Sequence, residues 1–295
     1  MAKVALGRLN AADEAAFVAA LSGVYEHAPW VAQAVCRQRP FATLAALHAA
    51  MMAAVRAAPA EQRLALIKGH PDLAGKAARA GAMTADSQAE QASAGLERLS
   101  EAEFAQFHRL NGAYREKFDI PFIICARRHS KDSILRQFEL RLHNSTAEET
   151  ERALAEIFRI AALRLDQRLE AADRLDVHGR LSTHVLDTHS GRPAVGVLVE
   201  LLELSTNGEQ RAITRTATNR DGRTDAPLIA GQPLPIGRYE LRFHVGEYFA
   251  GVAARLDDPP FLDVVPVRFA VANPEGDYHV PLLVTPWSYS TYRGS

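Results

Sequence analysis

The hydrophobic pattern of the chain changes its period once, between residues 172 and 180, and this change constrains the fold more than any other feature. Up to about residue 172, apolar residues recur every three or four positions in an alanine-rich sequence, which is typical of helices with one buried face. After Gly179 they alternate with polar residues, which is typical of half-buried strands. We therefore expect a multidomain α plus all-β fold, with an all-helical domain over residues 1–172, a linker over 173–179 and a β-sandwich over 180–295.

Several segments of the first half have helical spacing. The apolar stripes that predict a buried helix face are Phe17, Leu21 and Val24; Leu44, Leu47, Met51 and Val55; and Leu154, Ile157, Ala161, Leu165 and Leu169. Ser100 with Glu103, and Thr146 with Glu149, have the spacing of capping boxes, which open helices. The apolar run over residues 120–125 contains a proline and is too short for a helix, so we expect it to be extended.

The second half has the features of a sandwich of about seven or eight short strands. Leu241, Phe243 and Val245 alternate with charged and polar residues, as a half-buried strand should. Residues 247–256 fit one short helix between strands. The stretch 173–179 is charged and lacks apolar anchors, which favours a linker.

Composition excludes several functional classes. The formal net charge of −1 gives no electrostatic footprint for nucleic acid or an acidic membrane surface. The N-terminus has no apolar stretch long enough for a signal peptide or a membrane span. Cys36 and Cys125 have no partner at metal-ligand spacing, and the chain lacks a disulfide framework. We expect a reduced, cytoplasmic protein.

Three segments of the second half contain polar side chains in unusual arrangements. His184 lies in the run Leu-Ser-Thr-His-Val-Leu-Asp-Thr, Arg223 follows an Asn-Arg-Asp-Gly turn, and His279 precedes Val-Pro-Leu-Leu. The chain then ends in Tyr292-Arg293-Gly294-Ser295, although most termini fray. These segments resemble the 5-hydroxyisourate hydrolase family, the enzymatic relatives of transthyretin. The resemblance covers roughly the last 115 residues and implies a transthyretin-like fold.

The resemblance implies an active site at a subunit interface, and a homo-oligomer, a tetramer formed through this domain. Opening a cyclic acyl-urea with water needs a base near neutral pH, which either His184 or His279 can supply. It also needs a fixed positive group for the developing oxyanion, and Arg223 fits that role. Tyr292 and Ser295 would shape the substrate pocket.

A second set of motifs lies in the helical half. His70 opens the run His-Pro-Asp-Leu-Ala-Gly, and Ser87 opens Ser-x-x-Glu-Gln-x-x-Ala-Gly-Leu. Together with residues 122–126 and Ser130-Lys131, they resemble the decarboxylase of 2-oxo-4-hydroxy-4-carboxy-5-ureidoimidazoline (OHCU), over nearly all of the first 170 residues. The chain departs from that family at residues 119–120, where a glycine and an aromatic residue are usual.

The resemblance implies that His70 transfers protons and that Pro71 holds its backbone extended just after a helix. Ser87 and Glu90, one helical turn apart, would bind the ureido or ring nitrogens. Arg164 would lie near the substrate carboxylate. Backbone groups of Ile120 to Ile124 would add hydrogen bonds. The substrate's own imine and carbonyl groups can take up the electrons, so we expect no cofactor and no metal.

The two implied reactions are consecutive, because the hydrolase makes OHCU and the decarboxylase converts it to (S)-allantoin. One alternative is a zinc hydrolase, in which His184, His189, His244 and His279 supply ligands, although their spacing matches no zinc motif. Another is a binding protein, in which a non-catalytic transthyretin-like carrier is fused to a helical interaction domain. For the two consecutive reactions, the expected partners are the small-molecule substrates 5-hydroxyisourate and OHCU.

Overall fold

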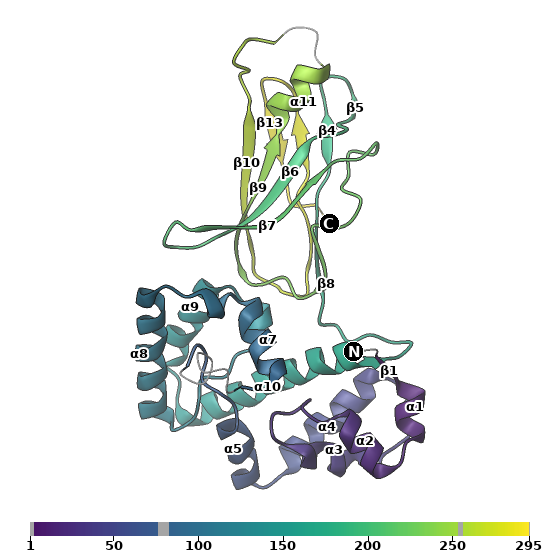
Figure 1. Cartoon of the computed structure of the whole chain (residues 1–295), viewed down its shortest axis with the longest axis vertical. Coiled ribbons are helices and arrows are strands. Elements are labelled where there is room, and N and C mark those ends of the chain that lie inside the picture. The colour runs from purple at the N-terminus through teal and green to yellow at the C-terminus, as the bar shows by residue number, and fades with distance from the viewer. Residues whose placement is uncertain (1–2, 76–82, 253–255, 295) are drawn as a thin grey trace. The chain divides into compact units, whose positions relative to one another are not determined.

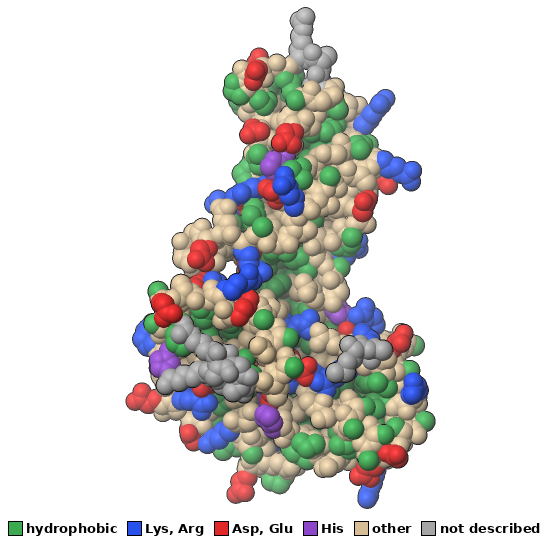
Figure 2. All heavy atoms as spheres, in the orientation of Figure 1, with side chains coloured by type: hydrophobic (Ala, Val, Ile, Leu, Met, Phe, Trp, Pro, Cys, Tyr) green, Lys and Arg blue, Asp and Glu red, His purple; other side chains and the backbone are tan. Residues whose placement is uncertain are grey.

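The computed structural model describes residues 3–75, 83–252 and 256–294. The chain divides into two compact units, Met1–Val177 and His178–Ser295 (Figure 1). Figure 2 shows acidic and basic side chains interspersed on the face in view, as the near-zero net charge suggests. None of the helices in the described residues is long and apolar enough to cross a membrane.

The first unit consists of helices packed around one apolar core. In Figure 1, α10 runs along the unit, with α8 and α9 near one end and α1 to α4 near the other. The helices in the described residues are α1 (Leu6–Ala11), α2 (Glu14–Ala20), α3 (Pro29–Cys36), α4 (Leu44–Ala57), α5 (Ala60–Lys68), α7 (Ala85–Ser93), α8 (Glu101–Phe118), α9 (Lys131–Arg141) and α10 (Thr146–Arg168), with short 3₁₀ helices η1 (Leu96–Arg98) and η2 (Ala126–Arg128).

The predicted apolar stripes are buried, but two of them extend beyond their helices. α2 ends at Ala20, so Leu21 and Val24 lie in the turn that leads to α3, where Gly23 has a φ of 79°. Leu169 lies just after α10 and pairs with Val4 in a two-stranded parallel sheet, formed by β1 (Val4–Ala5) and β2 (Leu169–Glu170). The first unit is therefore helical with one small β pair.

Capping boxes open both long helices of the unit. The box of Ser100 and Glu103 is confirmed at the start of α8. The box expected at Thr146 and Glu149 was wrong by one residue, because Ser145 and Glu148 form it. Ser145 has an extended backbone with φ −74° and ψ 162°, as an N-cap needs.

The stretch 173–179 is attached to the first unit more firmly than its charge suggested. Leu175 and Val177 are buried in the helical core, and the Asp173 carboxylate accepts a hydrogen bond of 2.9 Å from the backbone N–H of Leu44, at the start of α4. The expectation that this stretch lacks apolar anchors was therefore wrong. The boundary between the units falls after Val177.

The second unit is a β-sandwich with one short helix, α11 (Val245–Val252). Its described strands are β3 (Gly179–Ser182), β4 (Val185–Asp187), β5 (Arg192–Pro193), β6 (Leu198–Leu204), β7 (Gln210–Ala217), β8 (Ile229–Gln232), β9 (Gly237–His244), β10 (Val264–Val271), β11 (Asp277–His279), β12 (Leu282–Val284) and β13 (Tyr289–Thr291). Their orders are β10-β9-β6-β7, β11-β3-β8 and β13-β12-β4-β5. All three sheets contribute side chains to one buried core, for example Leu241, Leu181 and Leu282.

The described strands are more numerous than predicted, in part because two long extended segments are interrupted. The segment over 179–187 breaks at Thr183 and His184, between β3 and β4. The segment over 277–284 breaks at Val280 and Pro281, and proline has no N–H to donate to a ladder. Each interruption lies beside a histidine that the sequence singled out.

Candidate active sites

A pocket in the first unit brings together most of the residues predicted for the helical half. His70, Pro71, Ser87, Glu90, Ile124 and Arg164 all line it. Gln91 adds a polar side chain, and the apolar lining residues are Leu73, Phe122, Ile123, Ala126 and Ile160. Ile120 is buried but does not line the pocket, so nothing in the structure supports a direct role for it. The segment over 120–125 is irregular rather than helical.

His70 is held by the end of the helix that precedes it. Its Nδ1 lies 3.0 Å from the backbone oxygen of Leu66 in the last turn of α5. A carbonyl oxygen can only accept, so Nδ1 carries the proton and Nε2 keeps a lone pair. Burial lowers the pKa of His70 to about 4, against the smaller opposing effects of this hydrogen bond and of Glu26. His70 is therefore neutral at pH 7 and able to accept a proton.

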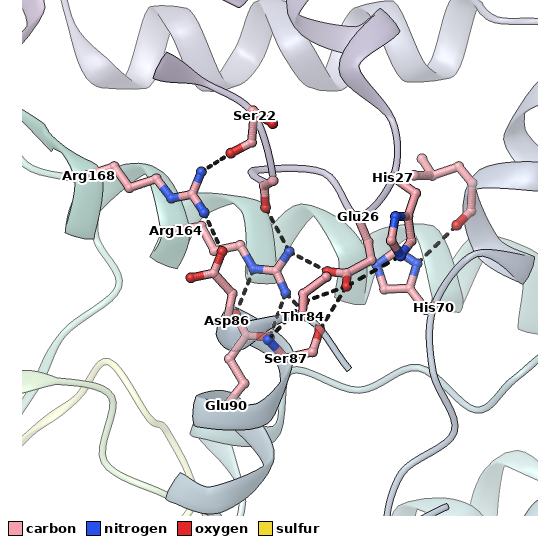
Figure 3. Close-up of polar contacts among 12 residues, drawn as sticks. Ser22, Glu26, His27, His70, Thr84, Asp86, Ser87, Glu90, Arg164 and Arg168 are labelled. Carbon is pink, nitrogen blue, oxygen red and sulfur yellow. Dashed lines mark hydrogen bonds and ion pairs between the residues drawn. The ribbon is translucent and has the colours of Figure 1, made fainter. Parts of the chain in front are cut away.

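Arg164 is almost completely buried, where the sequence alone would also have allowed an exposed helix charge. Its Nε and Nη2 donate to the two oxygens of Glu90 at 2.7 and 2.8 Å. Its Nη1 donates at 2.8 Å to both the backbone oxygen of Gly23 and the carboxylate of Glu26. Nη2 also lies 3.3 Å from the hydroxyl of Ser87. These contacts account for all five N–H groups of the guanidinium (Figure 3).

Glu26 is a residue of this cluster that the sequence interpretation missed. It lies in the turn between α2 and α3, next to His27, which has a positive φ of 50°. The residue is 3% exposed, and its carboxylate accepts hydrogen bonds from Thr84, Ser87 and Arg164. No periodic pattern marks an isolated acidic residue in a turn. Its partner Arg164 is 138 residues away, so the sequence offers no local signal for the pair.

Two buried charged residues hold the irregular segment that forms part of the pocket wall. Arg141 donates to the backbone oxygen of Ile123 at 2.8 Å, and its guanidinium lies 4.2 Å from the centre of the Phe122 ring. Glu156 accepts from the backbone N–H of Cys125 at 3.0 Å. Because each contact fixes a backbone or ring of residues 122–125, the wall is held from both α9 and α10.

The second unit brings His184 and His279 into direct contact. Nδ1 of His184 lies 2.6 Å from Nε2 of His279, and the rings are 19° from parallel. Nδ1 of His279 lies 2.9 Å from the hydroxyl of Ser182. Both nitrogens of His279 are thus engaged, and of the four ring nitrogens only Nε2 of His184 is without such a contact in the described part of the chain.

Arg223 is close to both histidines. It follows Gly222, whose positive φ of 69° makes the turn, and pairs with His184 in an isolated antiparallel bridge. Burial lowers the pKa of each histidine, and the positive charge of Arg223 lowers both further. The contact with His279 adds to the effect on His184. Both rings therefore favour the neutral form that a general base needs.

The C-terminal residues fold back onto this site. The backbone N–H of Gly294 donates to the oxygen of His279 at 2.8 Å, and a Cβ on Gly294 would lie 2.7 Å from the imidazole carbon Cδ2. Arg293 lies over the ring of Tyr278 at 4.7 Å. Tyr292 is 55% exposed, and Ser295 lies outside the described residues. The tail thus packs directly on His279.

Of the four histidines considered as zinc ligands, His184 and His279 lie together, but His189 and His244 have other partners. His244 lies 3.1 Å from Glu200, and His189 packs against Trp287. Among the residues that the structure describes, no three His, Cys, Asp or Glu side chains form a group that could hold one metal ion.

Two family models match the chain. The OHCU decarboxylase model matches residues 10–166, and the HIUase/transthyretin model matches residues 181–294. A 5-hydroxyisourate hydrolase of Deinococcus radiodurans is 58% identical over 118 residues, which are 40% of this chain and 98% of the relative. A 2-oxo-4-hydroxy-4-carboxy-5-ureidoimidazoline decarboxylase of Haloferax volcanii is 39% identical over 171 residues, 58% of this chain and 99% of the relative.

A solved structure is similar over nearly the whole chain. A crystal structure of (S)-allantoin synthase covers 99% of this chain and 100% of its own, with 35% sequence identity and a TM-score of 0.52. The same two kinds of unit therefore occur together in another protein.

Proposed function

We propose that this chain, which belongs to the OHCU decarboxylase family through its first unit and to the HIUase/transthyretin family through its second, catalyses two consecutive reactions. The second unit hydrolyses 5-hydroxyisourate to OHCU, and the first unit decarboxylates OHCU to (S)-allantoin. The observation that carries the proposal is the presence, in one chain, of a pocket around a neutral buried histidine and a separate pair of histidines beside an arginine.

Decarboxylation is assigned to the pocket of His70. Its free Nε2 takes the proton of the substrate hydroxyl, and the bond to the carboxylate then breaks. The electron pair passes into the imine of the substrate, whose nitrogen takes a proton from solvent. The resulting enolate collapses to a carbonyl as the adjacent carbon receives the proton that His70 holds. Delivery from one fixed imidazole makes the new carbon centre a single enantiomer.

The other pocket residues bind and orient the substrate. Glu90 and Ser87 present oxygens that can accept hydrogen bonds from ureido or ring N–H groups. Arg164 contributes by orienting Glu90, because its own N–H groups are already engaged. Pro71 and the backbone at Ile124 shape the walls, and the apolar lining excludes water.

Hydrolysis is assigned to the histidine pair, with Nε2 of His184 as the nitrogen that removes a proton from water. When Nδ1 of His184 donates to His279, Nε2 of His184 has a free lone pair. His279, held by Ser182, shares the positive charge by accepting the Nδ1 proton of His184. The proton taken from water then passes from Nε2 of His184 to the ring nitrogen of the substrate as the C–N bond breaks. Arg223 stabilises the negative charge that develops on the attacked carbonyl oxygen. Tyr292 contributes to the pocket.

An oligomer formed through the second unit, a tetramer, belongs to the same proposal, as does a cytoplasmic location. The edge strand β13 supports the oligomer, because β13 pairs only with β12 among the described strands and its residues are exposed, so its other edge is open to a second chain. Light scattering of the intact chain tests the assembly, and a monomer at micromolar concentration would contradict it.

The function is tested by following circular dichroism while a separate urate oxidase supplies fresh 5-hydroxyisourate. The proposal predicts that the chain speeds both decay of hydroxyisourate and appearance of (S)-allantoin. Decay at the spontaneous rate would instead favour the carrier alternative. Activity that survives prolonged chelation would exclude the zinc alternative.

A further inference from the structure

The carboxylate of Glu26 lies behind the decarboxylation pocket rather than in its lining, and both of its oxygens are used. Oε1 accepts from the hydroxyl of Thr84 at 2.7 Å and from that of Ser87 at 3.1 Å. Oε2 accepts from Arg164 at 2.8 Å. Burial acts to raise the pKa of Glu26, but the hydrogen bonds from Thr84 and Arg164 and the charge of Arg164 outweigh it and lower that pKa. Glu26 is therefore ionised and accepts hydrogen bonds only.

The contact with Glu26 fixes which way the hydroxyl of Ser87 points. A serine hydroxyl has one proton, and Ser87 donates it to Glu26. One lone pair of Ser87 faces Nη2 of Arg164 at 3.3 Å. What Ser87 can still offer the pocket is therefore a lone pair, so it meets the substrate as an acceptor.

The same carboxylate fixes Glu90 through the guanidinium of Arg164. Glu26 and the Gly23 oxygen hold the Nη1 edge of Arg164. The opposite edge is then aligned for the two parallel hydrogen bonds to Glu90, whose side chain is 17% exposed at the pocket. Figure 3 shows Glu26, Arg164 and Glu90 in this order across the cluster.

We infer that Glu26 is a positioning residue that makes this part of the pocket a set of acceptors, Ser87 and Glu90, and so selects substrates by their N–H donors. The inference rests on the proposed decarboxylation. It identifies the ureido and ring N–H groups, rather than the carboxylate, as the part of the substrate that faces α7. The carboxylate that is lost then faces the apolar wall formed by Phe122, Ile123 and Ile160.

Glu26→Gln is the variant that tests the inference. The amide has the same shape as the carboxylate, but its NH₂ group faces residues that are themselves donors, namely Thr84, Ser87 and Arg164. Ser87 must then turn its hydroxyl proton away from residue 26. Arg164 loses one of its two negative partners. We expect kcat/KM for OHCU to fall about tenfold to a hundredfold, mainly through a higher KM. A purely structural role would lower the amount of active enzyme and leave KM unchanged. The hydrolysis step, in the same sample, should be unaffected.

Asp86→Asn is the matched control. Asp86 is on α7, the helix of Ser87 and Glu90, and like Glu26 it pairs with an arginine, Arg168, without lining the pocket. Its loss should leave the KM for OHCU within about twofold of the original value. If the unaltered chain fails to consume OHCU, the proposed function fails. If it consumes OHCU and Glu26→Gln leaves KM and kcat unchanged, only the inference fails.

Inhibition of the decarboxylation by its product, (S)-allantoin, and by a methylated derivative gives a second readout. The unaltered chain should bind (S)-allantoin at least about tenfold more tightly than a derivative methylated on a ureido nitrogen, because one of the two acceptors would lose its donor. Glu26→Gln should reduce this preference. An unchanged preference would overturn the inference.

Glu26→Asp covers the case in which Glu26→Gln does not fold. It keeps the charge but is shorter by one methylene, so it cannot reach Thr84, Ser87 and Arg164 together. The expected result is a raised KM for OHCU and a reduced preference for (S)-allantoin over its methylated derivative. Wild-type values for both in the folded Glu26→Asp chain would overturn the inference.

Discussion

Nδ1 of His184 and Nε2 of His279 lie 2.6 Å apart, and the rings are nearly parallel. A hydrogen bond between two imidazole nitrogens needs one proton, so the pair shares one and titrates as a unit. The pKa of each ring is lowered, first by burial and then by neighbouring positive charge. The base is thus neutral at pH 7.

The first prediction concerns the pH dependence of hydroxyisourate hydrolysis. Because the neutral pair is the base, kcat/KM should be level from pH 7 upward and fall only below the ordinary histidine pKa of about 6.5. Replacing either ring by glutamine should lower kcat/KM by about 10² to 10⁴. A profile that declines already between pH 8 and 7 would contradict the lowered pKa.

Arg223→Gln should change both the rate and the pH profile. Loss of the positive group at the oxyanion lowers kcat by about 10² to 10³. Loss of the same charge beside both rings raises their pKa, so the acidic limb should move to higher pH. The control is Arg220→Gln, an exposed arginine in the same turn. An acidic limb that stays in place in Arg223→Gln would refute this electrostatic assignment.

Gly294→Ala should impair hydrolysis without unfolding the sandwich. The added methyl would lie 2.7 Å from Cδ2 of His279 and 3.2 Å from its Cβ, so the imidazole must move. A displacement near 1 Å from productive geometry costs about a hundredfold in rate. Gly251→Ala is the control, since a Cβ there meets nothing within 4 Å. Equal rates for the two variants would show that the tail does not position His279.

Arg141→Met tests the support of the pocket wall in the first unit. Arg141 and Glu149 form a buried ion pair, and Arg141 also holds the oxygen of Ile123. Removing one partner of such a pair should lower the unfolding free energy by about 3–5 kcal/mol, measured by urea unfolding of the helical signal. Arg136→Met, at an exposed position of the same helix, should change it by no more than about 0.5 kcal/mol. An equally small loss of unfolding free energy in Arg141→Met would show that the ion pair does not stabilise the first unit.

The sequence predicted the features that repeat or that lie within short segments. The change of period near residue 175 indicated the two kinds of unit, and the fold class is confirmed. His70, Ser87 and Glu90 could be found because each lies in a compact motif. The starts of α8 and α10 were predicted to within one residue, since Ser145 and Thr146 are chemically similar caps.

The features that depend on contacts distant in sequence could not be predicted. Glu26 meets Arg164 only through the packing of the α2–α3 turn against α10. The sequence also did not indicate that the rings of His184 and His279 touch, although it selected both. Ile120, chosen as part of an extended segment, is buried away from the pocket because only some residues of an irregular segment face a given cavity.

The most direct test of two separate sites is complementation between His70→Ala and His279→Ala. With fresh 5-hydroxyisourate, His279→Ala should delay its decay, and His70→Ala should accumulate OHCU, both followed by circular dichroism. An equimolar mixture of the two variants should restore rapid formation of (S)-allantoin, because each supplies the site that the other lacks. The account would be contradicted if either variant alone formed (S)-allantoin at the original rate, or if the mixture failed to restore it.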